Sequence, residues 1–169
     1  MGVKPAVAIV CGSGLGGIGD RVTDAKILPY TDIPDFPRST VEGHKGNLIF
    51  GHLNGVEVVC MQGRFHTFEG YPTALCAMPC KLFKMLGVKL VVLTNAAGGI
   101  NRNYQVGDYM LIKDHFSLPI LSLHHPLIGP NDSRYGPRFF PINNLYCKSI
   151  RDQFKHTRVK KKKNIFYYL

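Results

Sequence analysis

The segment AVAIVCGSGLGG, residues 6–17, decides the fold. Its first part, Ala6 to Val10, is a continuous apolar run, which is typical of a buried strand in a sheet covered on both faces. The glycines that follow free backbone amides to face an anion, and Ser13 adds a hydroxyl donor. The alternative is a tight turn without a ligand, and this loop alone does not decide between the two.

A hairpin and further strands extend this first element into a sheet. Asn54-Gly55 separates the apolar runs 47–50 and 56–61, and this dipeptide is the strongest short signal for two antiparallel strands. The remaining elements are expected as a helix over 72–86 that Pro79 kinks or breaks, a buried strand over 89–94, a strand over 109–113, an irregular segment over 114–141, and a helix over 143–154 capped by Asn143 or Asn144. We therefore expect an α/β fold with a mixed, partly parallel β-sheet flanked by helices.

Length and composition fit one globular domain. The chain has 169 residues, of which 45% are hydrophobic and 19% charged, and no apolar run approaches the roughly 20 residues of a membrane helix. The amino-terminal apolar stretch is too short for a secretory signal, and the five cysteines have no framework spacing. We expect a cytoplasmic protein without disulfides that does not associate with a membrane.

The net charge of +10 is concentrated at the C-terminal end. Residues 1–150 carry 14 basic and 10 acidic side chains, or +4, whereas residues 151–169 carry 7 and 1, or +6. Lys160 to Lys163 lie in a segment, 156–169, that shares no pattern with the rest, and we expect it to be a disordered basic tail. Nuclear import or polyanion binding is the alternative for this tail, but no nucleic-acid-binding fold is recognisable.

Basic and polar residues occur in further loops near predicted strand ends. His44 lies in the loop before the hairpin, and Arg64 and His66 follow its second strand directly. The segment 95–99, Asn-Ala-Ala-Gly-Gly, follows another buried strand and allows a ligand to approach the backbone. Arginine matches the oxygens of phosphate and histidine donates hydrogen bonds or moves a proton, so the set predicts a site for a phosphate-sized oxyanion.

Two other kinds of site are disfavoured. Residues 12–17 fit the dinucleotide pattern GxGxxG, but a loop, YTDIPDFPRST, follows where a full βαβ unit is required. Cys76 and Cys80 are one helical turn apart and lack two further ligands at suitable spacing, so no metal site is expected.

Six segments resemble purine nucleoside phosphorylase of the trimeric, mammalian-type class. They are GSGLGG at 12–17, FPRSTVEGHKG at 36–46, MQGRFHTFEGYP at 61–72, LTNAAGGIN at 93–101, VGDYMLIKDH at 106–115 and GPNDSRYGPRF at 129–139. The resemblance covers residues 6 to about 155. It implies a phosphorylase/hydrolase-like domain over 1–155 and the phosphorolysis of purine nucleosides such as inosine and guanosine, with inorganic phosphate as co-substrate and neither a metal nor an organic cofactor.

The resemblance also implies roles for individual residues. The phosphate ligands of the family fall on Ser13, His44, Arg64, His66 and the backbone amide of Ala96, with Arg64 and His66 as the catalytic pair. Phe68 stands where the family has a ribose-contacting tyrosine, and Phe139 matches a phenylalanine lent to the neighbouring subunit of a homotrimer.

The family's purine-binding residues have no counterpart in this sequence. Family members continue for more than a hundred residues, and that part supplies the glutamate and asparagine that recognise the base. The resemblance therefore implies a domain that is incomplete at its C-terminus. The alternative to an active enzyme is an inactive form that retains the phosphate site and associates with full-length subunits.

Overall fold

The computed structural model describes residues 4–159 and 165–166. Contacts divide the chain into two compact units, which are described separately. The first consists of Met1–Ala97 and His124–Tyr135, and the second of Gly98–Leu123 and Gly136–Leu169.

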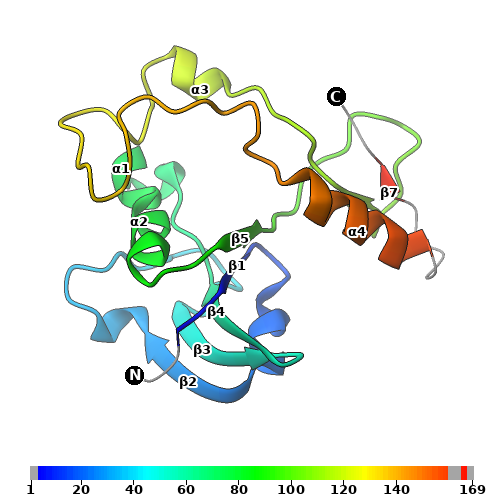
Figure 1. The fold of residues 1–169 in the computed structure, drawn as a ribbon, viewed down its shortest axis with the longest axis horizontal. Coiled ribbons are helices and arrows are strands. Elements are labelled where there is room, and N and C mark those ends of the chain that lie inside the picture. Colours follow the sequence, from blue (N-terminus) through cyan, green and yellow to red (C-terminus); the bar gives the residue numbers. More distant parts are fainter. Residues whose placement is uncertain (1–3, 160–164, 167–169) are drawn as a thin grey trace. The chain divides into compact units, whose positions relative to one another are not determined.

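A five-stranded sheet forms the centre of the first unit (Figure 1). Its strands are β1 (Val7–Cys11), β2 (Thr23–Pro29), β3 (Asn47–Leu53), β4 (Val56–Gln62) and β5 (Leu90–Leu93). Their order is β2-β3-β4-β1-β5, with β1 parallel to β4 and β5, and with β3 antiparallel to β2 and β4. The predicted mixed, partly parallel sheet is therefore confirmed.

The β3–β4 hairpin forms where the sequence predicts it. Asn54 and Gly55 both have positive φ, at 51° and 79°, as a two-residue turn of this type requires. The edge strand β2, in contrast, was not predicted. Its first five residues are exposed, and its register against β3 shifts between Thr23 and Lys26, so it lacks the alternating pattern of a half-buried strand.

Several short helices and one longer helix accompany the strands. They are η1 (Gly16–Arg21), η2 (Tyr30–Asp32), η3 (Thr67–Glu69), α1 (Thr73–Cys76), α2 (Met78–Met85), α3 (Leu118–Leu121) and α4 (Lys148–Val159), the η elements being 3-10 helices. The helix expected over 72–86 is interrupted at Ala77, and Pro79 lies in the first turn of α2, where a proline costs no hydrogen bond. The predicted break is confirmed.

Both faces of the sheet are covered, which explains the continuous apolar runs. One face packs against Phe83 of α2 through residues such as Val10 and Val59. The other face, which includes Ile9 and Cys60, packs against Ile18 of η1 and its neighbours. The strand expected over 89–94 forms as β5, but Val91, Val92 and Leu93 are exposed, so its expected burial is wrong: β5 is an edge strand of the sheet.

The second unit departs from the predictions at a strand and at a helix, and α3 lies within the segment expected to be irregular. The strand expected over 109–113 is limited to β6 (Tyr109–Met110), which pairs in parallel with β7 (Ile165–Phe166). The helix expected from residue 143 begins five residues later, so neither Asn143 nor Asn144 caps it.

In the segment from residue 156, which is expected to be a disordered tail, helix α4 continues to Val159 and residues 165–166 form β7. The lysine run 160–163 lies outside the described residues. Within the described part of the chain, none of the helices combines the length and the apolar character needed to cross a membrane.

Candidate functional site

Polar side chains from three loops of the first unit meet near the carboxyl ends of β1 and β4. Ser13 follows β1 by two residues, and Arg64 follows β4 by two residues. Ser13 Oγ lies 3.4 Å from His44 Nε2, and the rings of His44 and His66 stack with their centroids 5.4 Å apart. The structure thus brings Ser13, His44, Arg64 and His66 together.

His44 is held through its Nδ1 atom. The hydroxyl of Ser39 lies 3.0 Å from Nδ1, and the Arg64 amide donates to the same atom over 3.2 Å. The Arg64 carbonyl oxygen also lies 3.3 Å from Nδ1, so this atom has both a donor and an acceptor beside it and its contacts do not select one tautomer. Burial, together with the nearby charges of His66 and Arg64, lowers the pKa of His44. The lowered pKa favours a neutral His44 ring, whose Nε2 faces Ser13.

Arg64 has a buried donor that no atom of the described residues satisfies. Among the described residues, its Nε is fully buried and has no hydrogen-bond partner. Buried polar groups in proteins are almost always paired, and a guanidinium binds oxyanions through charge-assisted, often bidentate hydrogen bonds. The donor set fits an anion at this position.

His66 is fixed by a carboxylate that the sequence analysis missed. Glu69 Oε1 lies 2.7 Å from His66 Nδ1 and accepts the His66 amide over 2.9 Å. Glu69 Oε2 accepts the amide and the hydroxyl of Thr40 over 2.6 and 2.8 Å. Burial raises the pKa of Glu69, but the Thr40 and His66 hydrogen bonds outweigh it and hold the pKa at about 2. An ionised Glu69 orients the His66 ring through its contact with Nδ1.

The spacing of His66 and Glu69 contains a signal for this arrangement. The two residues are three apart at the start of η3, and their reciprocal hydrogen bonds form a capping box. The partner Thr40 lies 29 positions away in the sequence, and no local pattern indicates that contact.

The backbone at Gly63 allows His44 to approach closely. Gly63 has φ of +118°, and a Cβ atom built there would lie 2.7 Å from His44 Cβ. The buried hydroxyl of Tyr30 donates to the Gly63 carbonyl over 2.8 Å. Gly63 thus allows the chain to leave β4 with a positive φ, and the absence of a side chain there leaves room for His44.

The remaining predicted site residues are Phe68, Ala96 and Phe139. The Phe68 ring stacks on His66 at a centroid distance of 4.6 Å and is 76% exposed. Ala96 follows Thr94, whose hydroxyl accepts the Gly12 amide over 3.0 Å, so the loop after β5 begins beside the Gly-rich loop. Phe139 is exposed and belongs to the second unit, so the structure does not group it with the others.

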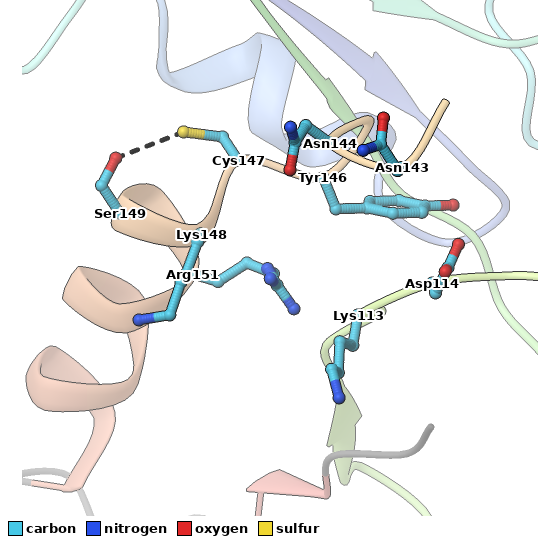
Figure 2. Close-up of a pocket in the computed structure, with 9 residues that line it drawn as sticks. All are labelled: Lys113, Asp114, Asn143, Asn144, Tyr146, Cys147, Lys148, Ser149 and Arg151. Atoms are coloured by element: carbon cyan, nitrogen blue, oxygen red, sulfur yellow. Dashed lines mark hydrogen bonds between the residues drawn. The ribbon is translucent and has the colours of Figure 1, made fainter. Parts of the chain in front are cut away.

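The second unit contains a cavity of about 460 Å³ that shares no residue with this cluster (Figure 2). It is lined by Lys113, Asp114, Asn143, Asn144, Tyr146, Cys147, Lys148, Ser149 and Arg151. Lys148 pairs with Asp152 over 2.7 Å, and Asp114 adds a carboxylate, so basic and acidic groups are mixed there. None of the predicted site residues lines this cavity.

Comparisons with known proteins agree with the sequence motifs. A profile of the phosphorylase superfamily matches residues 6–166, which extends beyond the last recognised motif. Purine nucleoside phosphorylase from Anopheles gambiae is 52% identical over 153 residues, covering 90% of this chain and 43% of the relative. The protein of the same name from Bos taurus is 50% identical over 154 residues, covering 91% of this chain and 53% of the relative.

A solved structure is similar in fold as well as sequence. The crystal structure of Schistosoma mansoni purine nucleoside phosphorylase in complex with inosine matches with a TM-score of 0.89 and 42% identity, covering 99% of this chain and 59% of that chain. The resemblance inferred from the motifs is confirmed. This chain spans about half the length of the curated relatives described above.

Proposed function

The chain belongs to the phosphorylase superfamily, and from this premise we propose that it binds inorganic phosphate in the cluster of Ser13, His44, Arg64 and His66. The observation that carries the proposal is the buried Nε of Arg64, which has no hydrogen-bond partner among the described residues, beside two stacked histidine rings. The Ala96 amide is proposed as a further donor. The reaction proposed for this site is the phosphorolysis of purine nucleosides.

In that reaction a phosphate oxygen attacks the anomeric carbon of the ribose. The new C–O bond gives ribose 1-phosphate, while the glycosidic C–N bond breaks, its electron pair goes to the purine, and the base takes up a proton. Arg64 and His66 hold the phosphate, the guanidinium of Arg64 balances its charge, and the His44 ring lies beside them. Positioning and electrostatic stabilisation carry the catalysis, without a metal or an organic cofactor.

The nucleoside would lie against the aromatic side of the cluster. Phe68 offers its ring through its stack on His66, and we propose that Phe139 covers the ribose of a neighbouring subunit in a homotrimer. Inosine and guanosine are the proposed substrates, in the cytoplasm. The free thiols of the five described cysteines agree with that location.

Inosine cleavage by the purified, size-selected chain tests this function. Release of hypoxanthine that requires phosphate, and that Arg64→Gln abolishes, is the expected result. Arg21→Gln serves as the matched control, because Arg21 is exposed and lies outside the cluster. Release that is independent of phosphate, or no release from a folded sample, would contradict the proposed reaction.

A second candidate is an inactive phosphate-binding form that associates with full-length subunits. The observation that favours it is the edge strand β5, where Val91 and Leu93 are 39% and 66% exposed. An apolar sheet edge of this kind pairs readily with another chain. Mixing the chain with a full-length homologue should then give co-elution and reduced activity, and neither effect would be seen if the candidate is wrong.

A further inference from the structure

The amide of Gln62 is buried where the three loops of the cluster meet. Gln62 is the last residue of β4 and is only 1% exposed. In the sheet it pairs with Cys11 of β1 on one side and with Asn47 of β3 on the other. Burying a polar side chain costs free energy unless its hydrogen bonds are made, so its partners matter.

The side-chain amide of Gln62 makes hydrogen bonds both as a donor and as an acceptor. Its Nε2 donates to the Gly16 carbonyl over 2.7 Å and to Asp20 Oδ1 over 3.2 Å, and its Oε1 accepts from Asn47 Nδ2 over 3.2 Å. A carboxylate lacks the donors, and an apolar side chain of the same length lacks both functions. Only a side-chain amide of this length satisfies all three partners.

Two of these partners, Gly16 and Asn47, lie in or next to segments that carry a proposed phosphate ligand. Gly16 belongs to the Gly-rich loop that holds Ser13, and Asn47 begins β3 three residues after His44. Gln62 itself stands two residues before Arg64. The Gln62 carbonyl also accepts the Gly46 amide over 2.8 Å, which ties the His44 loop to the end of β4.

Lys45 adds a second connection between the same segments. Its Nζ lies 2.9 Å from Asp20 Oδ1, the atom that also accepts from Gln62. This link is exposed at the surface and contributes little by itself. The buried hydrogen bonds of Gln62 therefore hold these segments together more strongly than the exposed ion pair of Lys45 does.

We propose that Gln62 is a positioning residue, which sets the spacing of Ser13, His44 and Arg64 for phosphate without touching the ligand. The proposal rests on the proposed function for the identity of the ligand. It adds a residue whose contribution to phosphate affinity comes from holding three loops in one arrangement.

Gln62→Met tests the proposal because it keeps the length of the side chain and removes its hydrogen bonds. We expect the Kd for inorganic phosphate, measured by calorimetry, to rise about tenfold, which corresponds to about 1.4 kcal/mol. Val59→Ala is the matched control, since Val59 is fully buried in the same strand but packs in the core on the other face. A Kd unchanged by Gln62→Met, or raised equally by Val59→Ala, would overturn the proposal.

Hydrogen exchange provides a readout that does not depend on phosphate. The amides of Leu15 and Ile18 are hydrogen-bonded within the Gly-rich segment and report on its order. Gln62→Met should accelerate exchange at Leu15, Ile18 and Arg64 selectively, whereas Val59→Ala should not. If the unaltered chain binds no phosphate, the proposed function fails. The pattern of hydrogen exchange then tests by itself whether Gln62 positions the loops. Uniform acceleration in Gln62→Met would overturn that role.

Discussion

Replacing Gly63 with alanine should strain the backbone and displace His44 from Arg64. At φ of +118° an alanine occupies a conformation that L side chains rarely adopt, which costs about 1–3 kcal/mol. The new methyl group would stand 2.7 Å from His44 Cβ, and overpacking of this kind costs a further 1–3 kcal/mol. The expected loss in the free energy of unfolding is therefore about 2–6 kcal/mol.

Two other glycines separate these contributions. Gly70 has φ of +91° but no atom within 4 Å of the Cβ position, so Gly70→Ala should lose only the backbone part, about 1–3 kcal/mol. Gly17 has neither a positive φ nor a close neighbour, and Gly17→Ala should stay within about 0.5 kcal/mol of the unaltered chain.

Urea unfolding of the three variants gives the comparison directly. Gly63→Ala should be the least stable, and it should also weaken phosphate binding because His44 moves. If Gly63→Ala is no less stable than Gly70→Ala, the close packing of His44 against Gly63 is not what the structure requires, and the reasoning fails.

Three further predictions concern other contacts of the cluster. Tyr30→Phe leaves the Gly63 carbonyl unpaired and should lower the free energy of unfolding by about 1–3 kcal/mol in urea titrations, whereas an unchanged midpoint would show that the hydrogen bond is not needed. The pKa of Glu69 is lowered from its ordinary 4.5 to about 2, so its contribution to stability is present above pH 4.5 and is lost as the pH falls toward 2. Glu69→Gln should flatten that acid dependence, and an identical slope would contradict the assignment. Phe68→Tyr should tighten inosine binding in the presence of phosphate about 2- to 10-fold, measured by calorimetry, if its hydroxyl gains a sugar partner.

The sequence predicts those parts of the fold that depend on local signals. The hairpin follows from Asn54-Gly55, because this turn needs two residues that accept positive φ. The buried strand β1 follows from its apolar run, whereas the similar run of β5 lies at an exposed edge. Strand β2 has no such signal, because its charged residues lie at an exposed edge and only the pairing with β3 makes it a strand.

The same distinction applies to the candidate site. Ser13, His44, Arg64 and His66 stand in recognisable motifs, and the structure brings them together. Gln62 lies inside one of these motifs, yet its importance comes from Gly16 and Asp20, more than 40 residues away in the chain. Contacts of this kind depend on the folded sheet, and the sequence contains no local pattern for them.

The central claim is that the cluster of His44, Arg64 and His66 binds inorganic phosphate. A phosphate titration followed through the histidine ring signals by NMR tests it most directly, because the chain has 7 histidines and only two belong to the cluster. We predict saturable shifts confined to His44 and His66, and their loss in Arg64→Gln. Shifts spread evenly over all histidines, or no shift at either residue, would contradict the claim.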